Sequence, residues 1–168
     1  MAGDPGLREH FEQLVADLQA VCEDIYGARL VSLAVFGSVG RSTPRPDSDI
    51  DLLLVADPLP DGRMRRSAEF EEVERRMAAP LATARRAGVE TRLSPVFKSP
   101  REIRQRHPLL LDLVDDARIL VDREGFLQGI LQELRERLAE LGARRIWRGN
   151  AWYWDLKPDY RQGEVFEL

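Results

Sequence analysis

Residues 30–55 read LVSLAVFGSVGRSTPRPDSDIDLLLV, and this stretch decides the fold. Residues 30–36 are apolar and β-branched enough to predict a buried strand that ends at Gly37. A loop rich in glycine, proline and serine follows, and residues 50–55 predict a second apolar strand. The stretch is therefore predicted to form two buried strands joined by a polar loop.

Two aspartates, Asp49 and Asp51, stand at the beginning of the second predicted strand. Because side chains alternate along a strand, both carboxylates project to one face, and the apolar residues between and after them project to the other. Two ionised carboxylates on one face repel each other, and a hard divalent cation that prefers oxygen ligands relieves this repulsion. The pattern predicts a Mg²⁺ site, with Mn²⁺ as the alternative ion, beside whatever Gly37 and Ser38 bind.

The sequence Phe36-Gly37-Ser38, the loop 39–48 and the strand pattern of residues 49–55 together resemble the signature of the nucleotidyltransferase superfamily that includes DNA polymerase beta. The similarity is greatest to its small, minimal bacterial and archaeal members. The resemblance implies an α/β fold of the nucleotidyltransferase type, with a mixed sheet flanked by helices. It also implies that the Gly37-Ser38 turn holds the β- and γ-phosphates of a nucleoside triphosphate, as glycine and a helix start allow. The aspartates would hold the metal ions.

The activity implied by the resemblance is metal-dependent transfer of a nucleoside monophosphate from a nucleoside triphosphate, with ATP expected, to a hydroxyl of a protein, an RNA or a small molecule. Minimal nucleotidyltransferases are often antitoxins that modify a toxin of the HEPN type, so a protein partner of this kind is the first expectation from resemblance alone. Arg41 in the loop is predicted to meet the triphosphate, because a guanidinium fork matches phosphate oxygens. A solvated loop charge is the alternative for Arg41.

Family members usually add a third acidic residue from the strand after the middle helix, and this chain departs from that pattern. The strand is predicted at residues 89–97, broken near Pro95, and alternation places Glu90 and Ser94 on one face. The usual acidic position falls on or near Ser94. Glu90 is the candidate catalytic carboxylate only in a different register, because it lies about 13 Å from Ser94 along an extended strand. The alternative is a catalytically silent nucleotide-binding or protein-interaction module.

The rest of the chain alternates predicted helices and strands, which indicates one α/β layered domain. A nucleotidyltransferase domain is predicted for residues 1–123, and residues 124–168 are predicted to be a C-terminal helix and aromatic tail packed on the same domain. The remaining elements predicted from periodicity are helices at residues 7–26, 63–87 (kinked or split at Pro80) and 124–141, a helix capped by Ser99, and a short strand at 119–121.

Composition narrows the class of protein further. The 168 residues are 43% hydrophobic and 32% charged, which is typical of a folded globular domain. A net charge of −4 gives no overall attraction to nucleic acid, although paired arginines along residues 63–87 leave nucleic-acid contact open. Neither a secretory signal nor an apolar run of membrane-spanning length is visible, so a cytoplasmic location without a membrane partner is expected. The single cysteine, Cys22, excludes an intramolecular disulfide.

The tail after residue 146 concentrates the aromatic residues, with all three tryptophans, Trp147, Trp152 and Trp154, and two of the three tyrosines. One interpretation is a platform that stacks a base or docks a partner. The other, favoured by the usual burial of aromatic side chains, is a lid over the core or a homodimer contact.

Overall fold

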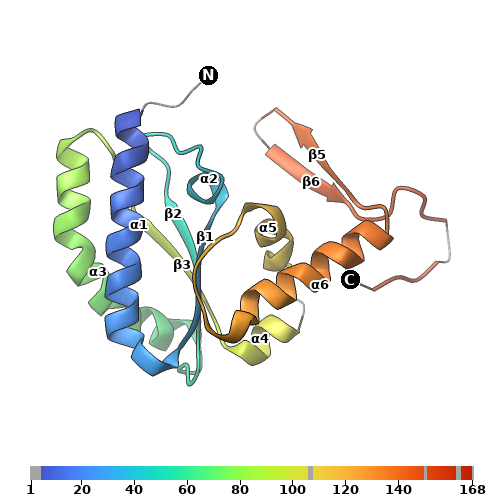
Figure 1. Cartoon of the computed structure of the whole chain (residues 1–168), viewed down its shortest axis with the longest axis horizontal. Coiled ribbons are helices and arrows are strands. Elements are labelled where there is room, and N and C mark those ends of the chain that lie inside the picture. The colour runs from blue at the N-terminus through green and yellow to red at the C-terminus, as the bar shows by residue number, and fades with distance from the viewer. Residues whose placement is uncertain (1–4, 106–107, 150, 162–163, 168) are drawn as a thin grey trace.

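Four strands form one mixed sheet in the order β3-β2-β1-β4 (Figure 1). The computed structural model describes residues 5–105, 108–149, 151–161 and 164–167. β1 pairs antiparallel with both β2 and β4, whereas β3 runs parallel to β2. The predicted α/β mixed sheet is confirmed. The strands of this sheet are β1 (Leu30–Phe36), β2 (Ile50–Ala56), β3 (Leu93–Lys98) and β4 (Arg118–Asp122).

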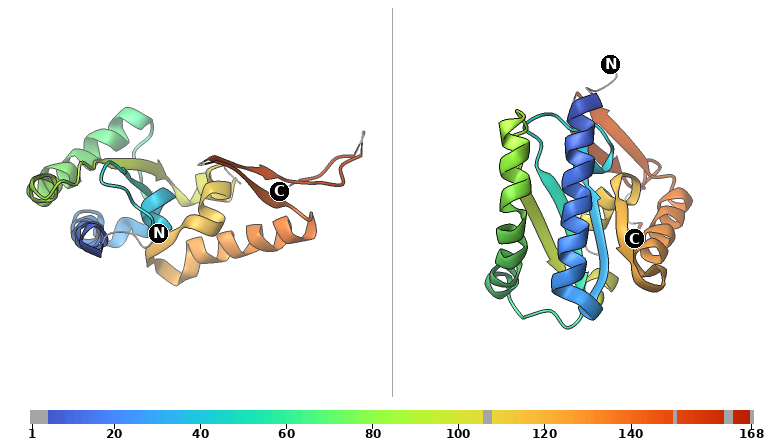
Figure 2. Two further views of the ribbon diagram at one scale, coloured as in Figure 1. Left: turned by 90° about the horizontal axis from the view of Figure 1, so that it is seen from above. Right: turned by 60° about the vertical axis from the view of Figure 1, so that its left-hand side comes forward.

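Helices cover both faces of the sheet (Figures 1 and 2). One face carries α1 (Pro5–Tyr26) and α3 (Arg63–Arg86), which lie side by side. The other face carries α4 (Pro100–Arg104), α5 (Leu109–Asp116) and α6 (Phe126–Glu140). The remaining elements are the single-turn helix α2 (Gly37–Gly40), the 3-10 helices η1 (Gly27–Arg29) and η2 (Arg123–Gly125), and a hairpin of β5 (Arg144–Arg148) and β6 (Ala151–Asp155). No helix in the described ranges is both long and apolar enough to cross a membrane.

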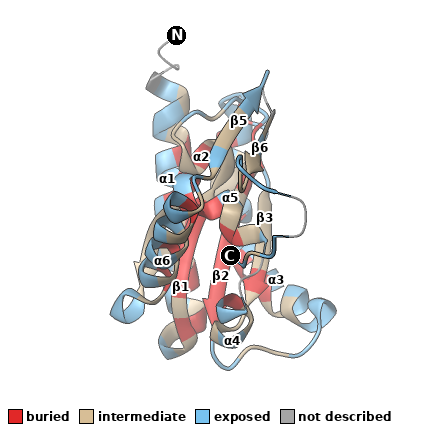
Figure 3. Ribbon diagram, turned by 90° about the vertical axis from the view of Figure 1, so that its right-hand side faces the viewer, coloured by how far each residue is buried: buried red, intermediate tan, exposed pale blue. Residues whose placement is uncertain are grey.

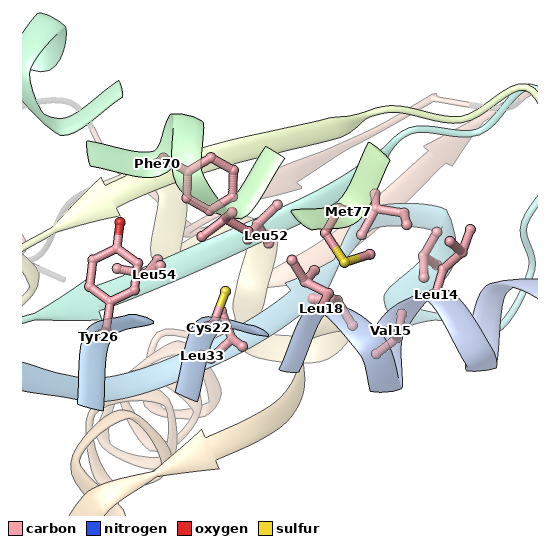
Figure 4. Close-up of a cluster of buried hydrophobic side chains, with 14 of the residues drawn as sticks. Leu14, Val15, Leu18, Cys22, Tyr26, Leu33, Leu52, Leu54, Phe70 and Met77 are labelled. Carbon is pink, nitrogen blue, oxygen red and sulfur yellow. The ribbon is translucent and has the colours of Figure 1, made fainter. Parts of the chain in front are cut away.

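Alternation along the strands divides the apolar core into two clusters, one on each face of the sheet. Leu52 and Leu54 of β2 pack with α1 and α3 on one face (Figure 4), and Leu53 of β2 packs with α5 and α6 on the other. Figure 3 shows β1 and β2 as the most buried strands. Cys22 is fully buried among the α1 residues of the first cluster, where burial raises the pKa of its thiol to about 12. It is a core residue.

Several boundaries differ from those predicted. β3 begins at Leu93 rather than at residue 89 and runs through Pro95 without a break. A proline is tolerated there because β3 is an edge strand that pairs only with β2. Pro80 lies inside α3 without splitting it. The cap at Ser99 is confirmed, since its side chain accepts a hydrogen bond from the Glu102 backbone N–H.

The C-terminal part of the chain is more regular than predicted, because β5 was not recognised in the sequence. α6 contributes Leu127 and Leu131 to the second core cluster, and the hairpin follows it. The division of the chain at residue 123 stays a prediction.

Candidate active site

Asp51 occupies the centre of the candidate site. Strand register places it beside Phe36 of β1 and beside Ser94 of β3. The chain turns at Gly37, directly after Phe36. The φ of Gly37 is +65°, a value that residues other than glycine rarely adopt. A Cβ added at Gly37 would lie only 2.6 Å from Asp51 Oδ2. Glycine is therefore required for the turn to approach this carboxylate.

The carboxyl group of Asp51 is half-buried, and burial raises its pKa above the ordinary value. A hydrogen bond from the Ser94 side chain lowers the pKa, the charge of Asp49 raises it, and the charge of Arg41 lowers it. The net shift is upward, so the ionised carboxylate is disfavoured here relative to water. A cation bound beside Asp51 would reverse that balance.

Asp49 lies one residue before β2 and, by alternation, on the same face as Asp51. Its carboxylate accepts hydrogen bonds from Arg92 Nε at 3.1 and 3.0 Å. The Arg92 side chain is 81% exposed, so this ion pair is of the weak surface type. Asp49 is thus held by a counter-ion that a ligand can displace at little cost.

Ser38 and Arg41 come from the single turn of α2 and its C-terminal end. The Thr43 N–H donates to the Ser38 carbonyl at 2.8 Å, and the Arg41 N–H donates to the Gly37 carbonyl at 3.1 Å. The Arg41 guanidinium pairs with Asp116, a carboxylate whose side chain is 3% exposed. Arg41 is therefore paired with a buried carboxylate, and its contact with a triphosphate stays a prediction.

Gly40 fixes α2 against α5, and its replacement by alanine is expected to destabilise the fold. A Cβ at Gly40 would lie 2.3 Å from the Asp116 carbonyl oxygen and 2.9 Å from that of Val35, and neither backbone atom can move alone. We expect a loss of about 1–3 kcal/mol in the free energy of unfolding, measured by urea denaturation. Gly129→Ala in α6 is the control, because its added Cβ has no atom within 4 Å, and it should gain about 0.5–1 kcal/mol. Equal denaturation midpoints for the two variants would contradict this packing.

Glu90 lies in the segment before β3, where its N–H donates to the Pro46 carbonyl at 2.7 Å. Together with Asp49 and Arg92 it lines a depression of about 440 Å³. The structure thus brings Glu90 to the Asp49 side of the site, while Ser94 is the residue of β3 beside Asp51. The catalytic role of Glu90 stays a prediction.

Asp116 and Arg145, two residues that sequence reasoning missed, hold Arg41 of the site in place. The carboxylate of Asp116 accepts hydrogen bonds from Arg41 and from both terminal nitrogens of Arg145, at 2.7 and 2.8 Å for Arg145. Burial raises the Asp116 pKa, but the hydrogen bonds from the two arginines outweigh it, and the pKa lies below the ordinary value. Helical spacing from the buried Leu113 is the one local signal that separates Asp116 from its exposed neighbour Asp115, and its two arginine partners come from distant segments.

The donor set fits a hard divalent ion bound together with a phosphate ligand. Asp49 and Asp51 offer carboxylate oxygens on one face, and Mg²⁺ is commonly held by one or two carboxylates plus substrate phosphates. Across the parts of the chain that the structure describes, no cluster of three or more His, Cys, Asp or Glu side chains could hold a metal. The protein by itself thus offers an incomplete shell, to which a triphosphate would add the remaining oxygens.

Comparison with known proteins identifies a family. The family model described as "Nucleotidyltransferase domain" matches residues 17–120. A Methanocaldococcus jannaschii protein named "Putative protein adenylyltransferase MJ1305" is 28% identical over 116 residues, which cover 68% of this chain and 74% of that protein. Among solved structures, a toxin–antitoxin structure with AMP-PNP has a TM-score of 0.44 at 18% identity, covering 78% of this chain and 92% of that one. A putative nucleotidyltransferase from Sulfolobus solfataricus gives 0.46 at 16%, covering 74% and 94%.

Proposed function

Because the chain belongs to the nucleotidyltransferase domain family, we propose that it transfers a nucleoside monophosphate from a nucleoside triphosphate, with ATP as the donor, to a hydroxyl group. One observation carries the proposal: the backbone of Gly37 lies against Asp51, on the strand face that Asp49 shares. A turn without side chains next to paired carboxylates is suited to holding phosphate oxygens and their counter-ion side by side.

Separate residues would bind the triphosphate and the metal ion. The Gly37–Ser38 turn would bind the triphosphate through backbone N–H groups and the Ser38 hydroxyl, and Asp49 and Asp51 would hold Mg²⁺ or Mn²⁺. Proteins of this family generally use divalent metal ions, which neutralise charge on the transferring phosphoryl group. The acceptor oxygen forms a bond to the α-phosphorus, the bond to the bridging oxygen of the β-phosphate breaks, and pyrophosphate leaves with that oxygen. The hydroxyl proton passes to Glu90 or to bulk water.

A protein side chain is the acceptor that the comparisons favour, since the archaeal relative carries the name of a protein adenylyltransferase. We therefore propose a serine, threonine or tyrosine hydroxyl of a partner protein as the acceptor. A partner of the HEPN type stays an expectation from the resemblance, as do a cytoplasmic location and a homodimer.

Labelled ATP tests the proposal. The pure protein is incubated with Mg²⁺ and cell extract, in parallel with ATP labelled on the α-phosphate or on the γ-phosphate. Relative to extract without the protein, we expect additional α-label in a protease-sensitive product and no additional γ-label. Label in an RNase-sensitive product would move the acceptor to RNA, and transfer of the γ-label or of no label would contradict nucleotide transfer.

A second candidate function is a catalytically silent nucleotide-binding module, and the position of Ser94 favours it. Ser94 stands on β3 directly beside Asp51, where a third carboxylate would complete the set of oxygen donors. A silent protein would bind ATP but transfer no α-label.

Ser94→Asp tests whether the missing carboxylate limits the reaction. We expect this variant to raise the rate of α-label transfer by about tenfold or more, because its carboxylate would add an oxygen ligand for the divalent ion next to Asp51. Ser94→Asn is the matched control, since it has the same size without the charge and should not exceed the wild-type rate. If Ser94→Asp transfers no faster than Ser94→Asn, the absence of a carboxylate at this position does not limit the reaction.

A further inference from the structure

The β5–β6 hairpin turns one face toward α5 and α2 (Figures 1 and 3). Arg145 stands opposite Trp154 in the hairpin, and Trp147 stands opposite Trp152, so these four side chains share one face, here called the inner face. The indole N–H of Trp154 donates to the Leu111 carbonyl of α5 at 3.1 Å. The inner face is therefore docked on the domain rather than free in solvent.

Asp116 connects the inner face to the turn of the candidate site. Its buried carboxylate accepts from Arg145 of the hairpin and from Arg41 at the end of α2. Arg41 directly follows α2, whose first residue, Gly37, lies against Asp51. The hairpin is thus joined through Asp116 and Arg41 to the turn of the site.

Trp147 is the member of the inner face that stays open. Its ring lies 4.9 Å from the Arg145 guanidinium carbon and 5.9 Å from that of Arg41, yet the residue is 52% exposed. Trp152 and Trp154 are less exposed, and Trp152 is covered by Arg145 at 3.9 Å. Two cations therefore hold Trp147 in place beside the site while a large part of its apolar surface remains in water.

We propose that Trp147 is the stacking surface for the base of the nucleotide whose phosphates the Gly37–Ser38 turn binds. The inference rests on the proposed function. A nucleotide with its phosphates at the turn can extend past Arg41, which directly follows α2 and whose guanidinium carbon lies 5.9 Å from the centre of the Trp147 ring. An exposed, positionally fixed indole offers a flat face to a base, and stacking accepts every base because each has a π-face. Base preference should accordingly be weak.

Titration calorimetry of the full-length protein with Mg²⁺ tests this assignment, using ATP and inorganic tripolyphosphate as separate ligands. Trp147→Ala is expected to weaken ATP binding by about tenfold or more, the size of one lost base–aromatic stack, and to leave tripolyphosphate binding unchanged. Trp147→Phe should retain most of the ATP affinity. Tyr153→Ala is the control, because Tyr153 is also exposed (44%) but lies on the opposite face of the hairpin.

The outcomes distinguish a failure of the proposed function from a failure of the role assigned to Trp147. If the wild-type protein binds neither ligand, the proposed function fails. If it binds both and Trp147→Ala binds ATP as well as the wild type does, only the role of Trp147 is overturned. An equal loss of ATP and tripolyphosphate affinity also overturns it, because the residue would then act through Arg41. Independently of any variant, ATP should quench the tryptophan fluorescence of the wild type and tripolyphosphate should not; equal quenching would contradict stacking.

Discussion

Asp51→Asn is expected to lower the rate of nucleoside monophosphate transfer by about 10²–10³-fold, the typical cost of removing one charged group that acts on the transition state. Asparagine keeps the size and shape of the side chain beside Gly37 but removes the negative charge that would hold the divalent ion beside the transferring phosphate. The measurement is the initial rate of α-label incorporation at saturating ATP. Asp61→Asn is the matched control, because Asp61 is exposed in the loop after β2, at the end of that strand opposite to Asp49.

The same substitution should make the metal-free protein more stable at neutral pH. Burial raises the pKa of Asp51 in the folded state, so the folded protein binds its proton more tightly than the unfolded chain does. The stability of the wild type therefore falls as the pH rises through the unfolded pKa toward the folded pKa, and asparagine removes this loss. Urea denaturation at pH 7 in the presence of a chelator measures the difference in the free energy of unfolding between the variant and the wild type. A variant that loses both activity and stability would indicate a structural role for Asp51 instead.

Asp116→Ala is expected to lower the free energy of unfolding by about 3–5 kcal/mol, the usual cost of removing one partner from a buried ion pair. Its carboxylate is nearly inaccessible to solvent and accepts from both Arg41 and Arg145, which would be left without this partner. Asp115→Ala is the control, because Asp115 is 42% exposed and lies 3.7 Å from the same Arg145. Chemical denaturation compares the two variants, and equal effects would contradict the burial of Asp116.

The stabilising contribution of Asp116 should decrease as the pH falls. Because the pKa of Asp116 is lowered in the folded state, its stabilising contribution is present above the unfolded pKa and is lost as the pH falls through the folded pKa. The difference in stability between the wild type and Asp116→Ala should therefore shrink in acid. A difference that stays constant down to the acid transition would show that the carboxylate contributes through packing rather than through charge.

The arrangement of the aromatic residues in the β5–β6 hairpin could not be predicted from the sequence. The aromatic cluster after residue 146 was evident, but the interpretation as a lid and the interpretation as a platform could not be separated. The register of β5 and β6 determines which side chains share a face with Arg145, whereas the role of that face stays a prediction. Arg144, the residue before Arg145, lies on the other face and is exposed.

The sequence by itself determined the features that depend on neighbouring residues. Alternation put Asp49 and Asp51 on one face of β2, and the apolar runs on both sides defined the two central strands. Counting along the sequence also placed the usual third acidic position on or near Ser94, and the register of β3 agrees, because it sets Ser94 beside Asp51. Only the tertiary structure decided that Asp116 joins Arg41 across 75 residues of sequence. The physical reason is that alternation follows from the local backbone, whereas strand register and the burial of a charge arise from contacts between distant segments.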